Sequence, residues 1–156
     1  MFSITVVSRP ALTLAGMCVR TNMATAFSDC SRLWHETFGP RMGEFSAVCA
    51  KESYGISWLV DEASGAFDYW AAVPVPADFP APSGMALTTL PGGLYAHTPV
   101  PTLDVLSQAY TAIFEAWLPA QKAYEANGEA ASYELYPETF LQTGALELFF
   151  PIKTKG

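Results

Sequence analysis

Residues 132–136 read Ser-Tyr-Glu-Leu-Tyr, a short β-type run that places one carboxylate, Glu134, among aromatic side chains. The pair Tyr54-Gly55 corresponds to Tyr133-Glu134 in the first half of the chain. A buried carboxylate is costly unless something pairs with it. Glu134 on an inner strand therefore indicates a bound cation, a proton or a substrate. The structural alternatives are an internal Lys, Arg or Tyr hydroxyl as its partner, or contact with solvent.

The elements on either side of these two runs follow the same order twice. β-branched runs indicate strands, and apolar residues at helical spacing indicate helices. In the first half we expect strands at 2–7 and 12–20 around a tight turn, a helix from Thr25 that Gly39-Pro40 ends, and a hairpin of 54–60 with 67–75. After a proline-rich linker that cannot be helical, we expect strands at 85–90 and 94–98 around the turn 91–93, a helix at 103–117 capped by Thr102, and strands at 132–136 and 146–152.

This order predicts a duplicated α+β unit within a single domain, 1–156. Matching positions lie roughly 75 to 85 residues apart, which gives pseudo-repeats at about 11–76 and 85–153. We expect the apolar faces of both helices to pack on one side of the sheet. On this prediction the other side of the sheet forms the cleft.

The composition favours a small apolar ligand over a nucleic acid. The chain has 156 residues and a net charge of −7, and it contains no cluster of Lys and Arg, which excludes the usual electrostatic surface for nucleic acid. Its four Trp, seven Tyr and ten Phe exceed what a small core needs, so we expect some of them to line a cavity. The acidic balance mildly favours a neutral or cationic ligand.

Three cysteines and the N-terminal residues bear on the cellular compartment. Cys18, Cys30 and Cys49 are odd in number and fit no metal-binding pattern, so we expect reduced thiols and no metal. Residues 1–4 lack the basic region of a signal peptide, and no apolar run is long enough to span a bilayer. We therefore expect a cytoplasmic protein that needs no cofactor and has no membrane partner.

Seven short motifs follow one another along nearly the whole chain: Leu33-Trp34, Tyr54-Gly55-Ile56, Phe67-Asp68-Tyr69, Leu90-Pro91-Gly92-Gly93-Leu94-Tyr95-Ala96, Trp117-Leu118-Pro119, Tyr133-Glu134-Leu135-Tyr136 and Pro151-Ile152. In this order and spacing they resemble the GyrI-like domain, also called the AraC-type effector-binding or multidrug-binding domain. The resemblance implies two β-α-β-β units related by a pseudo-two-fold axis. It also implies antiparallel sheets, two main helices and a central ligand cleft.

The same resemblance implies the ligand-binding residues. Drug-binding members use one Glu inside an aromatic box, which corresponds to Glu134, and aromatic residues that correspond to Tyr69 and Tyr95. Independently of the resemblance, spacing on the helix and strands makes Trp34, Tyr136 and Phe149 further candidates. Trp58 and Trp70 are equally possible, because a slip of one residue in register exchanges the faces of a strand.

Two functions remain open on the sequence. The first is a stand-alone binding module for lipophilic, aromatic and cationic molecules, linked to drug sensing or transcription regulation. The second is a hydrolase of strained or electrophilic molecules, with Glu134 as general base and Tyr69 or Tyr95 orienting the water. A protein-binding inhibitor is a third class, with an unknown partner. We find no helix-turn-helix among the 156 residues, so we expect no direct contact with DNA.

Overall fold

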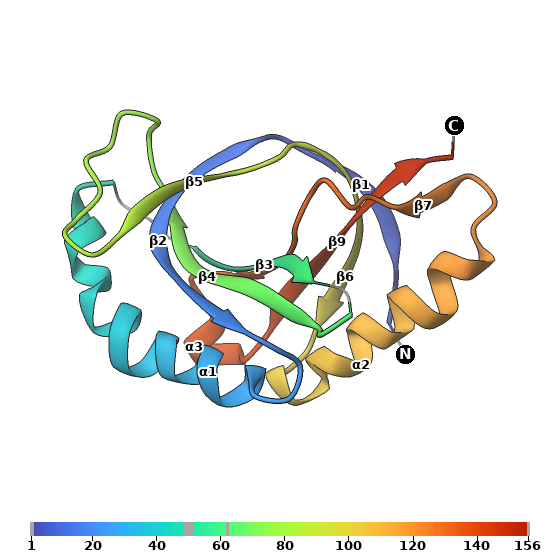
Figure 1. The fold of residues 1–156 in the computed structure, drawn as a ribbon, viewed down its shortest axis with the longest axis horizontal. Helices are drawn as coiled ribbons and strands as arrows, with labels where there is room; N and C mark the ends of the chain where they lie inside the picture. Colours follow the sequence, from blue (N-terminus) through green and yellow to red (C-terminus); the bar gives the residue numbers. More distant parts are fainter. Residues whose placement is uncertain (1, 49–51, 62, 156) are drawn as a thin grey trace.

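The computed structural model describes residues 2–48, 52–61 and 63–155. Within these ranges, nine strands form one antiparallel sheet that curls around its own concave face (Figure 1). The strands are β1 (Thr5–Arg9), β2 (Leu12–Thr21), β3 (Ser53–Asp61), β4 (Ala66–Pro74), β5 (Ala86–Leu90), β6 (Gly93–Val100), β7 (Tyr124–Ala126), β8 (Ser132–Tyr136) and β9 (Leu146–Thr154). The predicted α+β class with antiparallel pairing is confirmed.

The strand order places the runs at 54–55 and 133–134 on two adjacent strands in the middle of the sheet. The order is β1-β6-β9-β8-β3-β4-β2-β5, and β7 is added beside β9. Reading outward from the β8–β3 pair, each half contributes the same succession of strands, as a pseudo-two-fold axis at that pair requires. Glu134 on β8 lies directly opposite Gly55 on β3. The boundaries 11–76 and 85–153 remain our prediction for the repeats.

The turns at Pro10 and at residues 91–93 differ from the hairpins that we expected there. β1 pairs with β6 and β2 pairs with β4 and β5, so neither turn joins two strands that pair with each other. The two connections instead cross: a Cβ on Gly92 would lie 2.7 Å from the nitrogen of Ala11. Only glycine permits this approach. The third predicted hairpin, β3–β4, is confirmed.

Two long helical segments lie on the same side of the sheet (Figure 1). Each begins with α-helical or 3₁₀ turns, continues through a π-helical turn and ends in 3₁₀ turns. The first comprises α1 (Ala26–Arg32), a π turn (Leu33–Phe38) and a 3₁₀ stretch (Gly39–Val48), and the second comprises a 3₁₀ turn (Leu103–Val105), α2 (Leu106–Thr111), a π turn (Ala112–Trp117) and a 3₁₀ turn (Leu118–Ala120). Helical turns thus continue beyond Gly39-Pro40, contrary to expectation. A short helix α3 (Phe140–Thr143) precedes β9.

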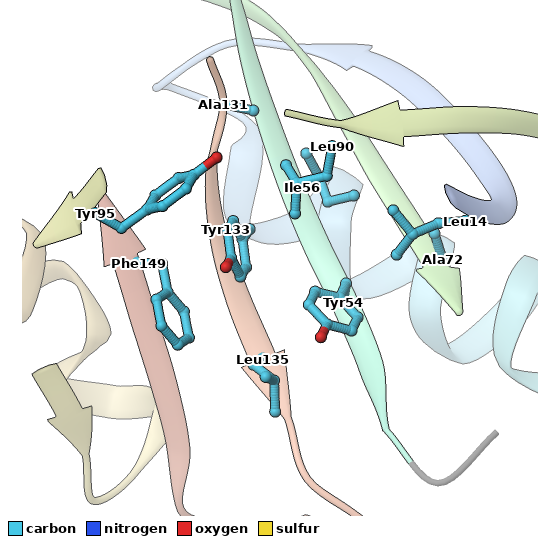
Figure 2. Close-up of a cluster of buried hydrophobic side chains, with 10 residues drawn as sticks. All are labelled: Leu14, Tyr54, Ile56, Ala72, Leu90, Tyr95, Ala131, Tyr133, Leu135 and Phe149. Carbon is cyan, nitrogen blue, oxygen red and sulfur yellow. The ribbon is translucent and has the colours of Figure 1, made fainter. Parts of the chain in front are cut away.

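Apolar side chains cover both faces of the sheet. Leu33 and Ile113 belong to the helical segments and are almost fully buried. Burial of each such side chain stabilises the fold by about 1.5–3 kcal/mol. The opposite, concave face carries a separate cluster of ten buried residues, among them Tyr54, Tyr133 and Phe149 (Figure 2). Phe27 departs from the expected packing of the first helix's apolar face against the sheet, because it is 92% exposed.

No helix in the described ranges is long and apolar enough to cross a membrane. Cys18 and Cys30 are free thiols. Cys49 lies outside the described residues.

Candidate functional site

Glu134 lies at the centre of the sheet and faces the helical segments. The period of two along β8 directs Tyr133 and Leu135 into the concave cluster, so Glu134 and Tyr136 point to the other face. Only 4% of Glu134 is exposed. We predicted the cleft on the face without helices, whereas Glu134 lies on the other face, between the sheet and the helical segments that cover it.

Three tyrosine hydroxyls surround the carboxylate. Tyr110 on α2 donates to Oε2 at 2.8 Å, Tyr136 donates to Oε1 at 3.1 Å and Tyr69 on β4 donates to Oε1 at 3.4 Å. Each hydrogen bond to an ionised group stabilises it by about 1.5–3 kcal/mol relative to leaving the group unpaired. The sequence-based alternative of a Tyr hydroxyl partner for Glu134 therefore describes its contacts in this structure.

Two further residues fix this arrangement. The indole Nε1 of Trp34 donates to the Tyr69 hydroxyl at 2.8 Å, so the first helical segment is connected to Glu134 through Tyr69. A side chain at Gly55 would collide with the Tyr69 hydroxyl and would place its Cβ 2.8 Å from Oε1 of Glu134. The absence of a side chain at Gly55 therefore makes room for the carboxylate and its tyrosine partner.

The electrostatics of the site are those of a buried carboxylate without a counter-ion. Within the described ranges, no Lys, Arg or His nitrogen lies within 4.0 Å of Glu134. Burial raises the pKa of Glu134 from 4.5 to about 7, although the three hydroxyls oppose that rise. Burial, and then the charge of Glu134, raises the pKa of Cys30 to about 12, which keeps that thiol protonated and unreactive.

The sequence-predicted ligand residues divide between the two faces. Tyr69, Trp34 and Tyr136 lie together around Glu134, and the Trp34 and Tyr136 rings meet edge to face at 5.5 Å. Tyr95 and Phe149 belong to the concave cluster, where both contact Tyr133. Phe149 does not share the face of Glu134 as predicted: Phe149 pairs with Tyr133, and Leu148 is the β9 residue opposite Glu134.

Trp58 and Trp70 also pack against the concave cluster. Neither of them shares the face of Glu134. The register of the strands therefore leaves neither tryptophan beside the carboxylate.

Sequence reasoning missed Tyr110. It lies on the apolar face of the second helix, where Leu106 and Ile113 also pack against the sheet, and helical spacing alone predicts a core position there. A signal was present: Tyr110 carries a hydroxyl, whereas Leu106 and Ile113 on the same face are purely apolar. A buried phenol needs a partner, and the carboxylate opposite it supplies one.

The arrangement can accept either a positive charge or a proton. A lipophilic cation would supply the missing counter-charge and would stack on aromatic rings. In the described chain no group of three His, Cys, Asp or Glu side chains could hold a metal ion. The carboxylate with its neutral pKa can also act as a general acid or base.

Comparison with known proteins places the chain in a family. Residues 5–152 match the model of the Cass2 family, described as integron-associated effector binding protein. No curated protein matches the sequence significantly. Among solved structures, the integron cassette protein of Vibrio cholerae aligns over 97% of both chains with 14% identity and a TM-score of 0.66.

Two other solved structures extend the likeness. SAV2435 bound to tetraphenylphosphonium aligns over 97% of this chain and 94% of its own, with 17% identity and a TM-score of 0.64. EcmrR in a DNA complex aligns over 99% of this chain and 58% of its own, with 12% identity and a TM-score of 0.69. At these identities the likeness establishes the fold, whereas the match over residues 5–152 establishes the family: the chain belongs to the Cass2 family of effector-binding proteins.

Proposed function

We propose that this effector-binding protein takes up lipophilic aromatic cations between the sheet and its two helical segments, with Glu134 as the charge partner. The observation that carries the proposal is the Glu134 carboxylate, which is 4% exposed and whose hydrogen-bond partners among the described residues are neutral hydroxyls. An unpaired buried charge is a liability in a protein without a ligand. A bound cation converts this liability into affinity.

The neighbouring side chains suit such a ligand. Trp34 and Tyr136 present aromatic rings, and the three tyrosine hydroxyls keep the carboxylate oriented. Stacking specifies shape loosely, so we expect a range of flat or multi-ring cations to bind. The related structure that holds tetraphenylphosphonium supports this chemical class.

Entry of the ligand requires movement, because the carboxylate is closed off from solvent. Trp34 and Tyr110 come from the two helical segments and both belong to the hydrogen-bonded network around Glu134. Each segment contains a π turn, at Leu33–Phe38 and Ala112–Trp117, and such turns often occur at functional sites. We propose that separation of these segments from the sheet admits the cation.

Tetraphenylphosphonium and tetraphenylborate provide a matched test, because they share a shape and carry opposite charges. We expect saturable quenching of tryptophan fluorescence by the phosphonium and much weaker quenching by the borate. Glu134→Gln should weaken phosphonium binding by about 1–3 kcal/mol. Glu129→Gln, which removes an exposed carboxylate, is the control and should bind as the wild type does. Equal affinity of wild type and Glu134→Gln would refute the role of Glu134.

A hydrolase is the second candidate function, and the pKa of about 7 at Glu134 is the observation that favours it. A general base works best when its pKa lies near the working pH. Turnover of a strained or electrophilic substrate that Glu134→Gln abolishes would support hydrolysis. In this scheme Tyr69 orients the water, whereas Tyr95 lies on the other face of the sheet and is a poor candidate.

We also propose that the protein acts in the cytoplasm. There it would link ligand binding to drug sensing or transcription regulation without contacting DNA itself. The free thiols of Cys18 and Cys30 are consistent with a reducing compartment. The net charge of −7 opposes association with a nucleic acid.

A further inference from the structure

We propose a second binding site on the concave face of the sheet, where Arg9 binds a small organic monocarboxylate. Arg9 is the last residue of β1, and its partner on β6 is Gly93, which has no side chain to cover it. The guanidinium therefore reaches across the sheet and lies over the ring of Phe149, 4.7 Å from its centre. This face is opposite to the one that carries Glu134.

One edge of the guanidinium is held by two phenols. Nε donates to the Tyr133 hydroxyl at 2.9 Å, and Nη2 donates to the Tyr54 hydroxyl at 3.3 Å. The rings of Phe149, Tyr133 and Tyr54 lie side by side on neighbouring strands (Figure 2). All three are at least 97% buried, so they form a rigid support that fixes the direction of the guanidinium.

The other edge of the guanidinium has no acceptor in the described part of the chain. A guanidinium has five N–H groups, and the two bonds to tyrosine use one on Nε and one on Nη2. The remaining edge presents one N–H from each of the two terminal nitrogens in parallel, which is the geometry that binds a carboxylate through both oxygens. Arg9 is half-buried, so part of its side chain remains open to solvent.

Arg9 differs in this respect from the other arginines. Arg20, Arg32 and Arg41 each form an ion pair with at least one Asp or Glu. Within the described ranges Arg9 has no carboxylate oxygen within 4.0 Å, and its hydrogen-bond partners are neutral hydroxyls. Among the arginines of the described ranges, Arg9 is therefore the one whose guanidinium is held in place without a carboxylate partner.

The surrounding charges restrict the ligand to a single negative charge. Glu52 accepts a hydrogen bond from Tyr54 at 2.8 Å, and Glu147 pairs with His97 at 2.6 Å beside Phe149. Both carboxylates oppose a dianion such as a phosphate monoester. A monocarboxylate matches the one guanidinium in charge and in its two acceptor oxygens.

The test is a titration with benzoate, with neutral benzamide as the matched probe, followed by the arginine Nε–Hε resonances in NMR spectra. We expect the Arg9 resonance to shift saturably with benzoate and not with benzamide. The resonances of the exposed Arg20 and Arg32 should move only at higher concentration. A shift of Arg9 no larger than that of these two residues would overturn the proposal.

Variants distinguish the effect of the two parallel N–H groups of Arg9 from the effect of its charge alone. Arg9→Lys retains the charge but loses the paired N–H groups, so it should bind benzoate at least about tenfold more weakly. Arg32→Gln is the control and should bind normally. Should the Arg9 variant fail to fold, Tyr133→Phe removes only the hydroxyl that holds Nε, and it should still weaken binding several-fold. Unchanged affinity in Arg9→Lys, or in Tyr133→Phe, would refute the proposed geometry.

The two sites can be distinguished because Glu134 and Arg9 lie on opposite faces. Glu134→Gln should leave benzoate binding unchanged. If benzoate instead shifts resonances of Tyr110 and binds more tightly to Glu134→Gln, where the repelling charge is gone, then benzoate binds at the central site and the second site does not exist.

Discussion

Replacing Glu134 by Gln should change how the stability of the protein depends on pH. In the folded protein, burial raises the pKa of this carboxyl from 4.5 to about 7. Between these two values the folded state retains a proton that the unfolded state releases. The free energy of unfolding therefore falls as pH rises through this interval, which is opposite to the usual behaviour of a carboxylate in an ion pair.

The magnitude follows from the size of the shift. A difference of about 2.5 pKa units corresponds to about 3 kcal/mol, lost progressively between pH 4.5 and pH 7. Gln has nearly the same volume, can bond to the same tyrosine hydroxyls and does not titrate. We therefore expect Glu134→Gln to match the wild type near pH 4.5 and to be more stable by up to about 3 kcal/mol near pH 8.

Urea unfolding of both proteins at several pH values between 4.5 and 8 measures this difference. Other titrating groups contribute equally to both curves and cancel. Cys30, with a pKa of about 12, lies outside the interval. A difference that does not change with pH would show that Glu134 does not titrate in this range. A difference that decreases with rising pH would mean that the carboxylate is stabilised by a partner that the structure lacks.

Three further outcomes follow from the same geometry. Affinity for tetraphenylphosphonium should be about tenfold weaker at pH 6 than at pH 8, because only about a tenth of Glu134 is ionised at the lower pH; a calorimetric titration that found no such dependence would contradict the charge partnership. Gly55→Ala should destabilise the fold by about 1–3 kcal/mol, because the methyl group collides with Tyr69, and thermal melting measures the loss. Fluorescence anisotropy with duplex DNA should show no binding at physiological salt, and tight, salt-sensitive binding would reveal a basic patch that the net charge of −7 conceals.

The central carboxylate, Glu134, is enclosed rather than open to solvent. The three hydroxyls that satisfy Glu134 come from β4, β8 and α2, so they hold the helix against the sheet while no cation is bound. On the proposed function, a cation must compete with these contacts. We expect this competition to reduce the affinity for any one ligand and to couple binding to movement of the helical segment.

Local pattern was sufficient to predict the elements and the repeat. β-branched runs and helical spacing located the main strands and helices, because side-chain periodicity is a property of neighbouring residues. The correspondence of Tyr54-Gly55 with Tyr133-Glu134 placed the two central strands at equivalent positions. The likeness to a known effector-binding family then indicated Glu134, and the structure shows that residue buried at the centre of the sheet.

Only the tertiary structure shows which strands pair with each other and on which face of the sheet each side chain lies. Whether β1 pairs with β2 or with β6 depends on contacts between residues far apart in sequence, and the crossing at Gly92 that separates the pairs leaves no local signal other than the glycine itself. A strand also has two equivalent faces until its register is known. For this reason strand spacing places Phe149 on the side of Glu134, whereas it lies with Tyr133 on the concave face. The resemblance to the family implied Tyr95, which also lies on the concave face.

The sequence by itself determined the α+β class and the duplicated order of elements, and it singled out Glu134 as a carboxylate on an inner strand. The tertiary structure decided which side chains meet that carboxylate. Tyr69, Tyr110 and Tyr136 come from three different elements, and the same sheet directs Arg9 onto Phe149 on its other face. Periodicity acts over a few residues and is visible in one dimension, whereas these contacts exist only after the curled sheet and the helices have brought distant residues together.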